Sequence, residues 1–115
     1  MHELALMNAV VERVCATARA EHARRVTDIR LVCGEMSGVV PDALNFCFDI
    51  CVAGTIAEGA TLHVERMPAA WRCASCTTDA ATLPDDSGTC PRCGTASLQL
   101  VQGREFSLAS ITVED

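Results

Sequence analysis

The spacing of apolar residues predicts that helices and strands alternate along the first part of the chain. Residues 4–22 carry apolar side chains at steps of three and four, which places them on one face of an amphipathic helix. That face consists of Leu4, Met7, Val11, Val14, Cys15 and Ala18. Residues 26–35 alternate in character instead and predict a half-buried strand. Its apolar side is predicted to hold Thr27, Ile29, Leu31 and Cys33, opposite Asp28 and Arg30.

A second helix and a second strand follow. Pro41 and Asp42 suit the first turn of a helix, where proline is tolerated and a carboxylate favours the helix dipole, and Gly54 ends it. The inward face of this helix is predicted to hold Leu44, Cys47, Phe48 and Cys51. Residues 61–67 predict the second strand.

The helix and strand patterns are lost between Pro68 and Gly103, where Thr, Ser, Asp, Gly and Pro gather between pairs of cysteines. This stretch has too few large apolar residues for a core of its own. Residues 105–114 then predict a third strand. Its apolar residues change parity midway, which predicts a bulge near Ala109 and Ser110.

The predicted fold class is therefore α/β: a small three-stranded sheet with two helices, plus an inserted module that resembles a four-cysteine zinc ribbon. Residues 1–67, completed by 104–115, are predicted to form the α/β domain, and 68–103 the inserted module.

Composition and charge exclude several classes of partner. No apolar run reaches the ~18 residues that a membrane span needs. All nine basic residues are Arg, against fifteen acidic residues, and the chain has no Tyr, one Trp and three Phe. A nucleic-acid interface needs a basic face and stacking aromatic rings, so neither nucleic acid nor a membrane is expected as a partner. The start of the chain lacks the pattern of a signal peptide, and we expect a cytoplasmic protein.

Four of the eight cysteines have metal-ligand spacing. Cys73 and Cys76 form one C-x-x-C pair, and Cys90 and Cys93 form a second after thirteen residues. Each pair can present two sulfurs to one ion, and two such pairs complete the closed tetrahedron of a structural Zn²⁺ site. Gly94 suits a turn that requires a positive φ. Iron would also accept four thiolates, and paired redox dithiols are the remaining alternative.

The other cysteines and the internal histidines are given no metal-binding role. Cys15, Cys33, Cys47 and Cys51 are predicted to be thiols of the core. His63 is predicted to lie on the exposed side of its strand, and His22 at a solvated helix end. We find no glycine-rich phosphate loop, nucleophile elbow or open zinc site, so enzyme activity is not expected.

The amino terminus offers a second group of metal donors. The Met1 amine, the His2 amide nitrogen and the His2 imidazole can close one five-membered and one six-membered chelate ring, which suits square-planar Ni²⁺ or Cu²⁺. Glu3 could fill the fourth position through its backbone nitrogen or its carboxylate. The alternative is an exposed, frayed chain end.

Taken together, these motifs resemble the HypA/HybF nickel metallochaperones of nickel–iron hydrogenase maturation. The motifs are Met1-His2-Glu3-Leu4, Gly34-Glu35-Met36-Ser37-Gly38-Val39, Glu58-Gly59-Ala60-Thr61-Leu62 and Cys90-Pro91-Arg92-Cys93. The resemblance implies that His2 is the essential nickel ligand, that Met1 and Glu3 contribute nitrogen ligands, and that the four paired cysteines hold zinc. Several family members have a His after the second cysteine pair, where this chain has Gly94.

The resemblance also implies partners. They are a HypB-type GTPase, the hydrogenase large subunit that receives the nickel and, for some members, urease maturation proteins. Two alternatives are a zinc-ribbon interaction adaptor without transferable metal and a small redox protein that uses its cysteine pairs.

Overall fold

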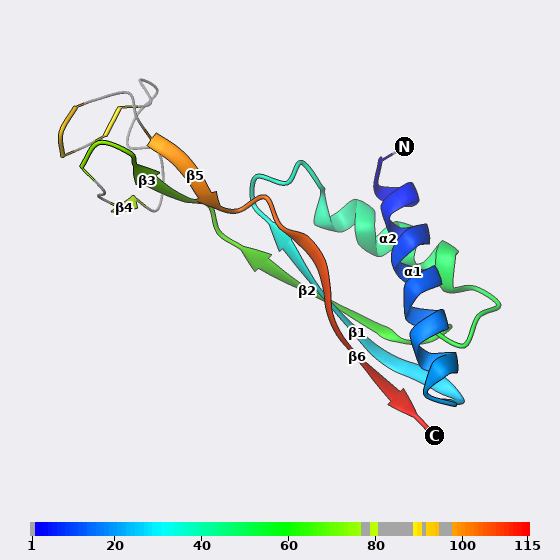
Figure 1. Ribbon diagram of the computed structural model, residues 1–115. Helices are drawn as coiled ribbons and strands as arrows, with labels where there is room; N and C mark the ends of the chain where they lie inside the picture. The colour runs from blue at the N-terminus through cyan, green and yellow to red at the C-terminus, as the bar shows by residue number, and fades with distance from the viewer. Residues whose placement is uncertain (1, 77–78, 81–88, 91, 95–97) are drawn as a thin grey trace.

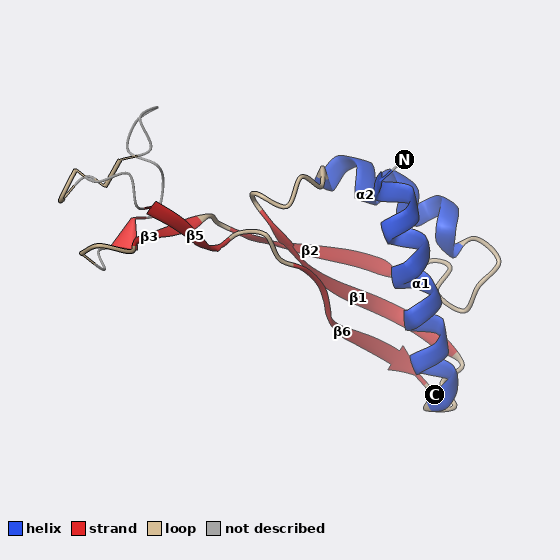
Figure 2. Ribbon diagram, turned by 45° about the horizontal axis from the view of Figure 1, so that its top comes forward, coloured by secondary structure: helices blue, strands red, loops and turns tan. Residues whose placement is uncertain are grey.

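A mixed three-stranded sheet with two helices on one face forms the larger part of the protein (Figure 2). The computed structural model describes residues 2–76, 79–80, 89–90, 92–94 and 98–115, without the side chains of residues 2, 79 and 80. Strand β1 (Arg25–Gly34) lies at the centre of this sheet, between β2 (Thr61–Met67) and β6 (Phe106–Glu114). The helices are α1 (His2–Ala20) and α2 (Pro41–Val52). The predicted α/β class and the three-stranded sheet with two helices are confirmed.

The chain order sets the direction of each strand. Strands β1 and β2 are parallel because α2 carries the chain back between them, and Leu31 lies opposite Val64 in their register. Strand β6 returns after the inserted module and pairs with β1 in the antiparallel direction. The central strand is consequently hydrogen-bonded along both of its edges, and its residues 29, 31 and 33 are buried.

The core lies between the two helices and the sheet. Helix α1 packs against α2, β1 and β6, whereas α2 packs against β2. The predicted inward face of α1 is buried, apart from Leu4, which is half-buried and packs on the core. Helix α1 begins and ends two residues earlier than predicted. It ends at Ala20 because His22 adopts a φ of 57° and Ala23 N donates to the Ala18 carbonyl at 3.0 Å.

Two bulges set which side chains of the sheet face the helices. The predicted bulge in the last strand is confirmed, since Arg30 pairs with Ser110 and Leu31 with Leu108, which leaves Ala109 as the extra residue. A second bulge, at Thr27, was not predicted. It leaves Val26 fully buried where the alternation predicted Thr27 to face the core.

The inserted module contains a second sheet, which the sequence pattern did not predict. Strand β3 (Ala70–Cys73) pairs in the antiparallel direction with both β4 (Asp79–Ala80) and β5 (Leu98–Gln102). This sheet lies at the far end of a molecule that measures 56 × 26 × 16 Å, away from both helices (Figure 1). No helix in the described ranges is long and apolar enough to cross a membrane.

The two sheets meet where three backbone segments cross. Gly34 N donates to the Glu105 carbonyl, Glu35 N to the Met67 carbonyl at 2.8 Å, and Met36 N to the Gly103 carbonyl at 2.7 Å. The side chains of Glu35 and Glu105 add to these bonds, because they accept from Ala69 N at 3.3 Å and from Gly103 N at 2.6 Å. The crossing is therefore held by backbone hydrogen bonds and two carboxylates.

Gly34→Ala should destabilise the fold much more than Gly38→Ala. A Cβ on Gly34 would overlap the Gly103 carbonyl oxygen, a backbone atom that cannot move without breaking the crossing. We expect a loss of about 3 kcal/mol or more from this overpacking. Gly38 has open space around it and only a positive φ of 81°, so its substitution should cost about 1 kcal/mol. Urea unfolding measures both values, and equal losses would contradict the interpretation.

Candidate metal sites

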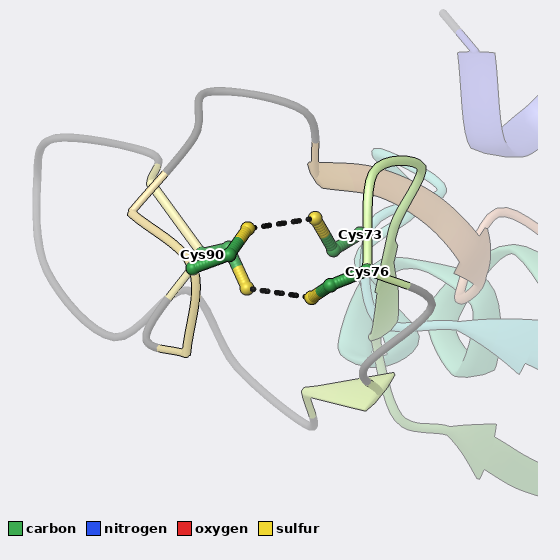
Figure 3. Close-up of side chains that lie close together, drawn as sticks. Cys73, Cys76 and Cys90 are labelled. Carbon is green, nitrogen blue, oxygen red and sulfur yellow. Dashed lines mark hydrogen bonds between the residues drawn. The ribbon is translucent and has the colours of Figure 1, made fainter.

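The four paired cysteines converge at the end of the inserted module. Cys73 is the last residue of β3, and Cys76 follows it in a turn, so the first pair is fixed by the second sheet. Cys90 lies on the other side of the cluster (Figure 3), and Cys93 completes the group of four. Cys73 and Cys90 are buried, Cys76 is half-buried and Cys93 is exposed.

The distances between sulfurs match a tetrahedral ion. The Sγ atoms of Cys73 and Cys93 are 3.6 Å apart, as are those of Cys76 and Cys90, and all four lie within 4.8 Å of one another (Figure 3). Four sulfurs at ~2.3 Å from a common centre are about 3.8 Å apart in a tetrahedron. The donor set and its spacing therefore suit one four-coordinate ion with sulfur ligands.

The second cysteine pair has the backbone of a metal-binding turn. Gly94 adopts the predicted positive φ, 75°, and its N–H donates to the Cys90 carbonyl at 2.9 Å. Arg92 N points at the Cys90 sulfur at 3.4 Å, an amide-to-sulfur contact that stabilises negative charge on the sulfur.

Replacing a cysteine of the cluster should abolish stoichiometric metal binding. Cys73→Ser and Cys90→Ser each remove a buried donor from a closed four-sulfur site, whose binding free energy is of order 10–16 kcal/mol in structural zinc modules. Cys51→Ser removes a thiol outside the cluster and should keep the metal. Metal content after gel filtration, and the thiolate-to-metal charge-transfer band of the Co²⁺-substituted protein, check both results. Metal retained in Cys73→Ser would exclude the four-sulfur site.

The predicted amino-terminal donors are only partly within the described residues. Met1 and the side chain of His2 lie outside them. The backbone of His2 begins α1, and helix geometry leaves the first amide N–H groups without an intrahelical partner. Glu3 Oε2 lies 3.4 Å from Val40 N, just before α2 begins, and accepts its hydrogen bond. This region lies in the helix layer, well away from the four-cysteine cluster (Figure 1).

Three of the four remaining cysteines are core thiols, as predicted. Cys15, Cys33 and Cys47 are buried, whereas Cys51 is half-buried between the two helices. The Cys51 thiol donates to Asn8 Oδ1 at 3.1 Å. Desolvation by burial raises the pKa of Cys51, and the neighbouring Cys47 raises it further. A thiol with a raised pKa is less readily ionised, which fits a packing role for Cys51.

His63 lies on the open face of the sheet, as predicted, but it has a partner there. Its Nε2 is 2.9 Å from Asp28 Oδ1, which links β2 to β1 on the side that faces away from the helices. Thr27 Oγ1 donates to the other oxygen of Asp28 at 2.9 Å. The hydrogen bond from His63, followed by that from Thr27, lowers the pKa of Asp28 below its ordinary value.

His63→Ala should raise the pKa of Asp28, and Thr27→Val should raise it less. Each substitution removes a hydrogen bond to the ionised carboxylate, and that of His63 is the larger cause. Because the folded-state pKa is lowered, the stabilising effect of Asp28 is present above its unfolded-state pKa and is lost as the pH falls through the folded-state pKa. Carboxyl ¹³C NMR titration measures the shifts, and an unchanged Asp28 pKa in His63→Ala would refute this assignment.

The sequence analysis missed an apolar surface on α2. Phe46 and Ile50 are 71% and 55% exposed, on the side of the helix opposite its buried residues. Two large apolar residues four positions apart, off the predicted inward face, were the available signal.

Comparisons with known proteins identify relatives over the whole chain. The family model described as "Hydrogenase/urease nickel incorporation, metallochaperone, hypA" matches residues 1–113. The hydrogenase maturation factor HypA of Streptomyces avermitilis is 40% identical over 100% of this chain and 88% of its own length. That of Rhizobium leguminosarum bv. viciae is 41% identical over 98% of this chain and 99% of its own length.

Two solved structures share the fold. One is titled the solution structure of HypA protein; its TM-score is 0.75 at 20% identity, covering 98% of this chain and 96% of that one. The other, the Ni metallochaperone HypA from Helicobacter pylori, has a TM-score of 0.67 at 18% identity, covering 99% of this chain and 98% of that one. At these identities the likeness supports the architecture alone.

Proposed function

Because this chain belongs to the HypA family of metallochaperones for hydrogenase and urease nickel incorporation, we propose that it binds Ni²⁺ at its amino terminus and delivers it to a hydrogenase large subunit. The observation that carries the proposal is the family match over residues 1–113, which includes Met1, His2 and Glu3. A HypB-type GTPase and the large-subunit precursor are the proposed partners, with urease maturation as a further client, and the proposed compartment is the cytoplasm. The family consists of maturation factors, and we propose no catalytic activity for this member.

The proposed nickel ligands are the Met1 amine, the His2 amide nitrogen, the His2 imidazole and a group of Glu3. The start of α1 at His2 supports this, because first-turn amides have no intrahelical bond that nickel binding must break. The Glu3 carboxylate already accepts a hydrogen bond from Val40. A site at a chain end also suits a cargo ion, since ligands on one short segment can be replaced in turn by those of an acceptor.

We propose that Cys73, Cys76, Cys90 and Cys93 hold a structural Zn²⁺. When bound, this ion supplies cross-linking and folding free energy, not catalysis, because four thiolates leave no open coordination position. The 3.6 Å sulfur separations and the small β3–β4–β5 sheet support this role. Residues 68–103 are accordingly proposed as a zinc module, and 1–67 with 104–115 as the nickel-binding domain.

Blocking the amino terminus should remove nickel binding and leave the fold intact. A Gly-Ser extension before Met1 converts the terminal amine to an amide and destroys the five-membered chelate ring, while every side chain stays in place. His2→Ala removes the imidazole and its six-membered ring. Both variants should lose the diamagnetic square-planar Ni²⁺ spectrum and keep zinc and helicity. Calorimetric nickel titration and circular dichroism measure these properties.

Nickel affinity should also fall as the pH drops below about 6.5, because the imidazole must be neutral to bind a metal. His22→Ala, in the exposed turn after α1, is the matched control and should bind nickel normally. If the extended protein or His2→Ala binds one nickel ion with unchanged affinity, the amino-terminal site is wrong. An otherwise intact protein that binds zinc but no nickel would support the interaction adaptor instead.

A further inference from the structure

Most of the large exposed apolar residues in the described chain lie in one short segment. Met36, Val40, Phe46 and Ile50 are each at least half exposed. Among the described residues, the other large apolar residue with this exposure is Val101, in the inserted module. Phe46 and Ile50 are one helical turn apart on the side of α2 that faces away from the sheet. We call this side, formed by Asp42, Phe46, Asp49 and Ile50, the outer face of α2. Each of these four residues is exposed.

The apolar residues on this outer face are not buried in the core of the protein. Helix α2 buries its opposite side, with Leu44, Cys47, Phe48 and Val52 each at most 4% exposed. A surface helix normally carries polar residues on its solvent side, because exposed apolar area there increases the tendency to associate. Adjacent exposed apolar side chains, one of them aromatic, are typical of the anchors at protein–protein interfaces.

The charged side chains of α2 and of the segments on either side of it in the chain have one sign. Between residues 31 and 62 the sequence contains no Arg or Lys, although it contains Glu35, Asp42, Asp49 and Glu58. Asp42 and Asp49 are exposed on the same side of the helix as the apolar pair. The outer face is thus apolar at its centre and acidic at its edges.

We propose that the outer face of α2 binds a partner protein through an amphipathic helix that presents an apolar ridge flanked by Arg or Lys. Charge complementarity selects this occupant, because basic side chains would meet Asp42 and Asp49. A second copy of this chain would bring the same carboxylates against one another, and an anionic membrane surface would be repelled by them.

The position of this surface connects it to nickel handover. Glu3, in the first turn of α1, accepts a hydrogen bond from Val40, which directly precedes α2. A protein bound along α2 would therefore lie beside the first turn of α1 (Figure 1). The role in handover rests on the proposed nickel function, whereas the docking itself does not.

A synthetic amphipathic helical peptide of leucine and lysine serves as the probe, and its leucine–glutamate analogue as the control. The lysine peptide should bind, with ¹⁵N–¹H shift changes concentrated in residues 42–53, and the glutamate analogue should not. The double variant Phe46→Ser/Ile50→Ser keeps the net charge of the chain and should bind the lysine peptide about 30-fold more weakly. Asp42→Asn/Asp49→Asn should also weaken binding and reduce its dependence on salt.

Val101→Ser is the matched control, because it removes an exposed apolar residue elsewhere; it should bind the peptide like the parent protein. Nickel binding by Phe46→Ser/Ile50→Ser should be unchanged, which separates a failure of docking from a failure of the nickel proposal. Unchanged peptide affinity in that variant, equal binding of the glutamate analogue, or shift changes centred outside α2 would overturn the proposal. So would a dimer of the parent protein in sedimentation experiments that Phe46→Ser/Ile50→Ser abolishes, because the occupant would then be a second copy.

Discussion

The backbone crossing at Gly34 is the constraint on which both sheets depend. The missing Cβ of Gly34 would overlap the Gly103 carbonyl, and that of Gly103 would lie 2.9 Å from Ala69 Cα, so the backbones of the three segments approach one another directly at these two glycines. On one side of the crossing they continue as β1, β2 and β6, and on the other side two of them continue as β3 and β5 (Figure 1). The metal module is thus an extension of the strands of the larger sheet, and its placement follows from theirs.

The elements of the larger sheet could be predicted from sequence because their periodicity is local. The change of parity between Leu108 and Ile111 revealed the bulge in β6, since both residues must face the core. The bulge at Thr27 left no such signal, because Val26 and Thr27 are both β-branched and either could face inward. The second sheet was missed because β3 and β5 are only four and five residues long and lie among turn residues.

The metal donors and the α2 surface differ in how far sequence alone could describe them. Two residues between cysteines fix the geometry of each chelating pair locally, so the grouping of Cys73 with Cys76, and of Cys90 with Cys93, is readable from spacing. Exposure of Phe46 and Ile50 depends instead on which side of α2 meets the sheet. That choice is made by Leu44 and Phe48 together with residues distant in the chain. A hydrophobic residue in a helix is ordinarily assigned to the core, so these two were passed over although they lie off the predicted inward face.

The pairing of β3 with β5 has a consequence for how the larger sheet closes. Strands β2 and β6 are separated by 38 residues, 68–105, and this long loop must be closed when β6 pairs with β1. Once the module is folded, Ala70 lies opposite Gln102, so the two ends of the long connection are already side by side. The loop that remains to be closed then has only a few residues, which lowers the entropic cost of pairing β6 with β1 by about 1–2 kcal/mol. An ion bound by the four cysteines would in this way favour the larger sheet without contacting it. Its binding would fold the module and so shorten the open loop between β2 and β6.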